Sequence, residues 1–132
     1  MLKYQLDTNM CIFTIKNKPP HVREKFNLNS SSLCISTITL CELIHGAEIS
    51  LAPELNVRVI EGFIARINIL SYDSAAAVHS GQIMTELSQK NIQMNPFDIM
   101  IAGHARSKGL IIASNNARKF DPIKGLRVEN WS

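Results

Sequence analysis

Short apolar runs alternate along this sequence with longer stretches in which apolar residues recur at helical spacing. The short runs predict strands at residues 2–6, 33–35, 69–72, 110–113 and 126–130. The longer stretches predict a helix that begins near Pro53 and helices at residues 9–17, 20–29, 37–50, 74–90 and 96–109. Strands that alternate with helices are typical of a parallel sheet covered by helices on both faces. We therefore expect an α/β fold, and the length of 132 residues is that of one domain spanning 1–132.

Residues that start or stop helices stand at several of the predicted ends. Pro19 and Pro20 are expected to end the first helix, because proline lacks the N–H that a helix interior needs. Ser36 and Asp73 each precede a helix and can cap it by accepting a hydrogen bond from a free N–H group. Gly109 follows the last long helix, where glycine favours the left-handed conformation that ends helices.

Polar residues fall where predicted strands end and predicted helices begin. Asp7 directly follows the first strand, Asp98 lies in the first turn of its helix, and Glu42 is about six residues into another. Crossover helices run antiparallel to the strands, so helix N-termini and strand C-termini meet at one edge of a sheet. We expect the three carboxylates to converge there. Other polar candidates for the same pocket are Thr8, Asn9, Ser114, Asn115 and Asn116.

Each carboxylate also has a purely structural interpretation. Asp7 can cap the helix that follows it, and an acid in a first helical turn is stabilising without any chemistry. Glu42 is harder to assign to a solvated face, because Ile38, Cys41 and Ile49 lie on or near the same side of its helix. A carboxylate against apolar neighbours must be paired, protonated or bound to a metal.

Three converging carboxylates with serine and asparagine oxygens would form an all-oxygen site, which suits Mg²⁺ or Mn²⁺ and not zinc. Divalent ions in such sites activate water and stabilise the charge that develops in phosphodiester hydrolysis. A zinc site built from Cys34, Cys41 and His45 is the competing interpretation. It is weakly supported, because no C-x-x-C pair accompanies these residues.

The charge balance permits a nucleic-acid partner without requiring one. Fourteen Lys and Arg residues against eleven Asp and Glu residues give a net charge of +3. Solvated faces are the alternative explanation for the basic residues. Those before residue 26 or after residue 105 include Lys3, Lys16, Lys18, Arg23, Lys25, Arg106, Lys108, Arg118 and Lys119.

Nothing in the sequence directs the chain into or across a membrane. No apolar run approaches the roughly 18 residues that span a bilayer, and the N-terminal MLKYQLD lacks the apolar core of a secretory signal. The three cysteines are odd in number and lie in apolar surroundings, as expected of reduced, mostly buried thiols. We expect a cytoplasmic protein.

Four segments together resemble the PIN domain, and more closely the VapC toxins of bacterial VapBC toxin–antitoxin pairs. They are LDTN at 6–9, TLCELIHGAE around Glu42, NPFDIMIAGHA at 95–105, and SNNARKF with the later VENW. The resemblance covers essentially the whole chain and implies an α/β/α sandwich with a parallel sheet of about five strands. It also implies a Mg²⁺- or Mn²⁺-dependent endoribonuclease. Asp7, Glu42 and Asp98 fall on the family's metal-binding acids, which leaves Thr8 or Asn9 to cap the first helix.

The same resemblance implies a substrate and partners. Close relatives in enteric bacteria cut tRNA in the anticodon stem-loop, commonly the initiator tRNA, and thereby arrest translation. A cognate VapB antitoxin wraps the toxin and places basic residues in its pocket. The toxins usually form homodimers, and larger assemblies form with the antitoxin.

One departure from the family concerns the acidic pocket. Close relatives have Arg-Glu-Phe where this chain has Arg118, Lys119 and Phe120, and many distant PIN domains have an aspartate at the position of Asn116. A fourth carboxylate is therefore missing unless Asp121 reaches the pocket. The alternative function is that of a PIN-fold protein that holds RNA or an antitoxin with impaired cleavage or none.

Overall fold

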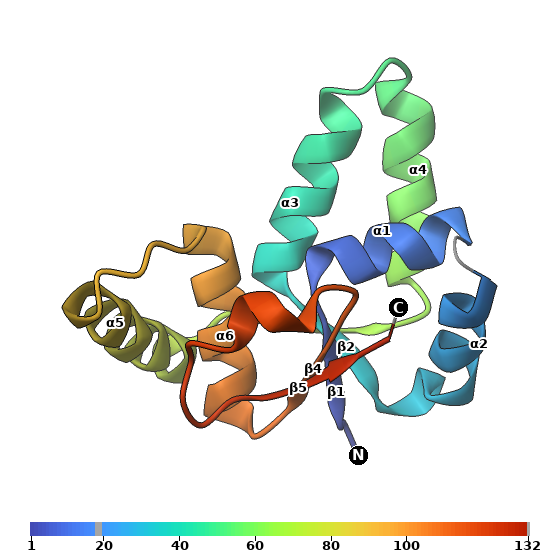
Figure 1. The fold of residues 1–132 in the computed structure, drawn as a ribbon. Coiled ribbons are helices and arrows are strands. Elements are labelled where there is room, and N and C mark those ends of the chain that lie inside the picture. Colours follow the sequence, from blue (N-terminus) through green and yellow to red (C-terminus); the bar gives the residue numbers. More distant parts are fainter. Residues whose placement is uncertain (18–19, 132) are drawn as a thin grey trace.

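The computed structural model describes residues 1–17 and 20–131 and contains one five-stranded parallel sheet. The strands are β1 (Tyr4–Leu6), β2 (Leu33–Ser36), β3 (Asn68–Leu70), β4 (Ile111–Ser114) and β5 (Arg127–Asn130). Their order across the sheet is β3-β2-β1-β4-β5, and each neighbouring pair is parallel (Figure 1). The α/β class and all five predicted strands are confirmed, with strand ends within two residues of the prediction.

Helices connect the strands at the predicted places. The helices are α1 (Thr8–Lys16), α2 (Pro20–Leu28), α3 (Thr37–Glu48), α4 (Pro53–Ile64), α5 (Ser74–Gln89) and α6 (Pro96–Lys108), and two 3₁₀ turns are η1 (Ser30–Ser32) and η2 (Ala117–Phe120). Ser36 and Asp73 cap α3 and α5 through their side-chain oxygens, and Gly109 ends α6 with a φ of 66°. These three predicted caps are confirmed. Lys18 and Pro19, the latter expected to help end the first helix, lie outside the described residues.

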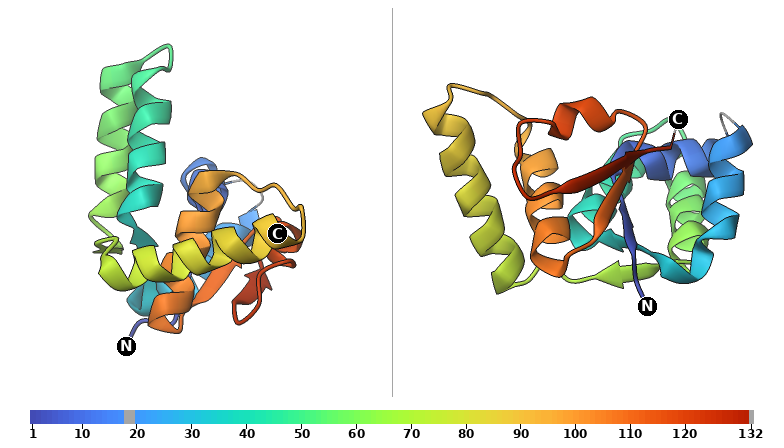
Figure 2. Two further views of the ribbon diagram at one scale, coloured as in Figure 1. Left: turned by 90° about the vertical axis from the view of Figure 1, so that its left-hand side faces the viewer. Right: turned by 60° about the horizontal axis from the view of Figure 1, so that its bottom comes forward.

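The alternation of side chains along the strands divides the core between the two faces of the sheet. Leu33 and Ile35 of β2 pack with α1, α2, α3 and α4, whereas Cys34 between them packs with α5 and α6. Figures 1 and 2 show the same division, with α5 and α6 on the opposite side of the sheet from α1 and α2. The result is a sheet with helices on both faces.

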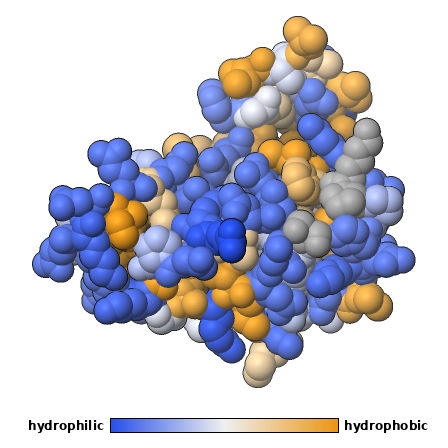
Figure 3. Space-filling model, in the orientation of Figure 1, coloured by the Kyte–Doolittle hydropathy of each residue, from blue (hydrophilic) through white to orange (hydrophobic). Residues whose placement is uncertain are grey.

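The α3–α4 hairpin extends away from the sheet, as Figure 1 and the left view of Figure 2 show. Its outer end carries exposed apolar side chains, Ile49, Leu51 and Leu55, and Figure 3 shows orange patches there. Hydrophilic side chains cover most of the remaining face in that view. Among the helices within residues 1–17 and 20–131, none has both the length and the apolar character needed to cross a bilayer.

The strand order reverses beside β1. The chain moves from β1 through β2 to β3 on one side, then crosses to place β4 and β5 on the other. Parallel sheets leave a crevice outside the strand C-termini at such a reversal, because the connections on either side of it run in opposite directions. Asp7 follows β1 and Ser114 ends β4, so both lie at this position.

Helices α5 and α6 approach each other closely at Gly103. A Cβ atom at Gly103 would lie 2.7 Å from the backbone nitrogen of Ser80 and would also overlap the Ser80 hydroxyl. Ser80 is buried, and its backbone cannot move aside without shifting α5. The glycine is therefore required by the close helix contact.

We expect Gly103→Ala to lower the free energy of unfolding by about 1–3 kcal/mol, because it overpacks this contact. Gly81→Ala in α5 is the matched control, since nothing lies within 4 Å of its Cβ position. The control should raise stability by up to about 1 kcal/mol through helix propensity. Urea denaturation followed by circular dichroism measures both variants, and equal effects would contradict the packing explanation.

Candidate functional site

Asp7 is a buried carboxylate whose two oxygens have different partners. Its side chain is 1% exposed. One oxygen, Oδ1, accepts a hydrogen bond from the Met10 N–H at 2.9 Å and so caps α1. The other, Oδ2, accepts a hydrogen bond from the Ser114 hydroxyl at 2.6 Å and lies 3.6 Å from the Lys119 ammonium. The prediction that Thr8 or Asn9 would cap α1 is wrong, because one carboxylate serves the cap and still presents an oxygen to the pocket.

Asp98 faces Asp7 across the side chain of Lys119. It lies in the first turn of α6, whose N-cap is Asn95. Lys119 Nζ is 3.4 Å from Asp98 Oδ1 and 3.6 Å from Asp7 Oδ2, so a single cation bridges the two carboxylates. The side chains of Asp98 and Lys119 are 25% and 21% exposed, which places them at the mouth of the site.

Glu42 joins this group through Thr8. The Thr8 hydroxyl donates a hydrogen bond to Glu42 Oε1 at 2.6 Å, and Thr8 is the residue next to Asp7. Glu42 is half-buried, but Cys41 and Ile49 are exposed. The prediction that Glu42 is pressed against an apolar face is therefore wrong, and a neutral hydroxyl is the partner that the structure gives it.

The polar residues that end or follow β4 differ in their contacts with the site. The Ser114 hydroxyl also accepts a hydrogen bond from the Asn116 N–H at 3.0 Å, which holds the loop against Asp7. Asn115 Oδ1 is buried, and the structure gives it no hydrogen-bond partner. Asp121 is exposed directly after η2, and among the described residues no ion pair links it to Lys119.

Burial raises the pKa of Asp7 above its ordinary value of 3.8, because the protein interior disfavours the ionised carboxyl. The hydrogen bonds from Ser114 and Met10 and the charge of Lys119 lower this pKa, and the nearby charge of Asp98 raises it. Desolvation is the largest of these effects. The electrostatics of the site therefore favour a cation beside Asp7.

The donor set fits Mg²⁺ or Mn²⁺ better than zinc. Asp7 and Asp98 already hold one positive charge between their oxygens, and Mg²⁺ in proteins commonly uses one or two carboxylates together with water and substrate phosphates. Across residues 1–17 and 20–131, no three His, Cys, Asp or Glu side chains lie close enough together to hold a metal ion. This excludes a ready-made three-carboxylate cluster, and it also disfavours the zinc alternative, whose Cys34 is buried while Cys41 and His45 are exposed.

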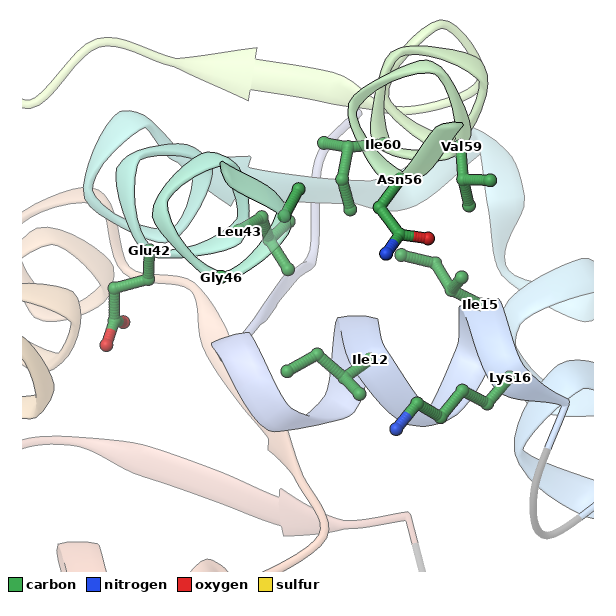
Figure 4. A pocket seen from close by; sticks show the side chains of 10 residues that line it. Ile12, Ile15, Lys16, Glu42, Leu43, Gly46, Asn56, Val59 and Ile60 are labelled. Carbon is green, nitrogen blue, oxygen red and sulfur yellow. The ribbon is translucent and has the colours of Figure 1, made fainter. Parts of the chain in front are cut away.

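An apolar groove adjoins the site between α1 and the α3–α4 hairpin. Its cavity volume is about 310 Å³, and Figure 4 shows Ile12, Leu43 and Ile60 facing it. Glu42 stands at one end and Lys16 at the other (Figure 4). The groove cannot be predicted from the sequence, because the helical spacing of these residues predicts burial and gives no sign of the gap between the helices.

Two known proteins and one solved structure are similar to this chain over at least 99% of their length. The protein named tRNA(fMet)-specific endonuclease VapC from Shigella flexneri is 62% identical over 132 residues, which are 100% of both chains. The protein of the same name from Salmonella typhimurium is 61% identical over 131 residues, 99% of each chain. A crystal structure of DNA-bound VapBC from Salmonella typhimurium has a TM-score of 0.96 to this fold at 61% identity, covering 100% of both chains.

The PIN domain family matches residues 4–126. Both this match and the relatives agree with the family that the motifs of the sequence resemble, and the five-stranded parallel sheet agrees with the fold implied by that resemblance. The chain therefore belongs to the VapC family of PIN-domain proteins.

Proposed function

We propose that this chain is the toxin of a VapBC pair and that it cleaves tRNA in the cytoplasm as an endoribonuclease dependent on Mg²⁺ or Mn²⁺. The observation that carries the proposal is the pair formed by Asp7 and Asp98 around one positive charge at the reversal in strand order. The names of relatives at 61% and 62% identity support tRNA(fMet) as the substrate.

Asp7 and Asp98 would hold the divalent ion through carboxylate oxygens. When bound, the ion supplies an activated water and neutralises charge on the scissile phosphate. Ser114 fixes the direction of Asp7 Oδ2 through its 2.6 Å hydrogen bond. Glu42 lies one hydrogen bond away through Thr8, so it can orient a water at the edge of the site rather than bind the ion as a third close carboxylate.

The substrate is a polyanion, so an acidic pocket needs basic residues near its entrance. Arg118 is exposed in η2 directly beside Lys119, and Lys16 is exposed at the far end of the groove. These side chains can contact phosphates on either side of the cleaved bond. Their arrangement supports RNA binding across the mouth of the site.

The non-cleaving alternative is less favoured. It rests on Lys119 lying in the acidic pocket, and the ion pairs with Asp7 and Asp98 do place it there. A lysine side chain is flexible, however, and both carboxylates of the pair remain present. The relatives at 61% and 62% identity are named as endonucleases.

We also propose that the groove between α1 and the α3–α4 hairpin receives part of the antitoxin. One relative of known structure, 61% identical to this chain, is a VapBC complex. The groove is largely apolar and ends at Glu42, so a segment lying in it could pass from apolar contacts to the acidic site. Arginine or lysine at the end of that segment would form charge-assisted hydrogen bonds with the carboxylates.

Metal dependence and Asp98→Asn test the active site together. With Mg²⁺ or Mn²⁺ the purified protein should cleave tRNA(fMet), EDTA should abolish cleavage, and zinc should substitute poorly.

Asp98→Asn preserves size and helix propensity at the start of α6 but removes a charge, so we expect cleavage to fall by about two orders of magnitude or more. Gel analysis of labelled tRNA measures this, and a variant as active as the parent would refute the assignment of Asp98.

Asp7→Asn should separate stability from activity. Because the pKa of Asp7 is raised on folding, the folded chain holds this proton more tightly than the unfolded chain, and the free energy of unfolding falls as the pH rises through the folded pKa. Asparagine can still cap α1 and has no such penalty. In EDTA, the variant should gain stability relative to the parent at pH 7 but not at pH 3, while tRNA cleavage is lost. Thermal unfolding at the two pH values measures the gain, and a stability difference independent of pH would contradict it.

Gly46→Leu should block the groove without disturbing the fold. Gly46 lines the groove, and nothing lies within 4 Å of its Cβ position. We expect the affinity for the cognate VapB antitoxin to fall by about tenfold or more, with tRNA cleavage retained. Gly62→Leu in α4 is the control, since its Cβ position is equally open but does not line the groove. Equal affinities for the antitoxin in calorimetry would show that the groove is not its binding surface.

A further inference from the structure

The Lys119 ammonium occupies the space between the two carboxylates assigned to metal binding. Its Nζ is 3.4 Å from Asp98 Oδ1 and 3.6 Å from Asp7 Oδ2. Both distances are those of ion pairs, and one of the carboxylates is almost fully buried, with 1% of its side chain exposed. A divalent ion bound by the same two oxygens would occupy the same space.

A buried carboxylate at this position needs a positive charge nearby, whatever its source. Leaving an ionised acid in the interior without a partner is strongly unfavourable. The hydroxyl of Ser114 and the N–H of Met10 supply hydrogen bonds but no net charge. Within residues 1–17 and 20–131, Lys119 is the one cationic side chain that forms an ion pair with Asp7 or Asp98.

The backbone of Lys119 is held in place by its neighbour, while its side chain reaches the protein surface. The next residue, Phe120, is 1% exposed and belongs to the core on the α5–α6 face of the sheet, which anchors η2. The Lys119 side chain is 21% exposed and lies at the mouth of the site. Its Nζ also lies 5.2 Å from the centroid of the Phe120 ring. Rotation about the side-chain bonds alone can therefore carry the ammonium out to solvent.

We propose that Lys119 is a built-in counterion that substitutes for the divalent ion in the metal-free protein and must leave Asp7 and Asp98 before they can bind the ion. The inference rests on the proposed function, since it takes these two aspartates as the metal ligands. Lys119 stabilises the metal-free fold and lowers the affinity for the metal by competing for the same oxygens. The site is thus held inactive by a contact within the chain until the lysine side chain swings outward.

Direct metal binding tests this exchange without measuring cleavage. Isothermal titration calorimetry with Mn²⁺ alone should show that Lys119→Met binds about tenfold more tightly or better than the parent, because the competing charge is gone. In EDTA the same variant should melt about 2–5 °C below the parent, because Asp7 and Asp98 lose their counterion. The rise in melting temperature on adding Mn²⁺ should accordingly be larger for the variant.

Two further variants separate the charge of Lys119 from other effects. Lys119→Arg keeps the charge and should bind Mn²⁺ no more tightly than the parent. Lys124→Met makes the same change in net charge at an exposed residue outside the site, and its affinity should stay within about twofold of the parent. If the affinity of either variant for Mn²⁺ increased as much as that of Lys119→Met, the proposal would be overturned.

The outcomes also distinguish this proposal from the proposed function. Equal Mn²⁺ affinity in the parent and Lys119→Met would overturn the counterion role and leave the metal site standing. Failure of every form to bind Mn²⁺ would overturn the metal site and the counterion role together. If Lys119→Met does not fold, Lys119→Gln takes its place in the same titration, since it also removes the charge.

Discussion

A carboxylate that is almost completely buried where the strand order reverses is the constraint on which this site depends. Asp7 is fixed there because it follows a central strand and caps the helix that begins next. Only 1% of its side chain is exposed, so its negative charge is barely solvated by water. The residues around it either donate hydrogen bonds, as Ser114 does, or carry positive charge, as Lys119 does.

The sequence predicts the fold well because local signals and tertiary structure agree. Strand ends fall within two residues of their predicted places, and Ser36, Asp73 and Gly109 end or begin helices as expected. The convergence of Asp7 and Asp98 at one edge also follows from topology alone, because parallel strands and their crossover helices leave few alternatives. The topology brings these residues to one edge of the sheet, but it does not determine which of their atoms come into contact.

The details that the sequence could not supply depend on side-chain direction. A helix cap and a pocket ligand looked like competing roles for Asp7, yet its two oxygens point to different partners. Glu42 seemed to face apolar residues, but the placement of α1 brings the Thr8 hydroxyl to it. For Lys119, the family resemblance implies the loss of an acid, and the structure shows that the ammonium in its place reaches two other carboxylates.

An internal counterion changes how folding and metal supply are related. Some small metal-binding domains, such as zinc fingers, fold only when the metal is bound, because the binding free energy is part of their folding free energy. Here the charge of Lys119 already offsets that of Asp7 and Asp98, and a core on each face of the sheet supports the fold independently of the site. If Asp7 and Asp98 bind the ion as we propose, folding needs no divalent ion, whereas cleavage does. Under the same proposal, the lysine that stabilises the metal-free chain also raises the metal concentration that cleavage requires.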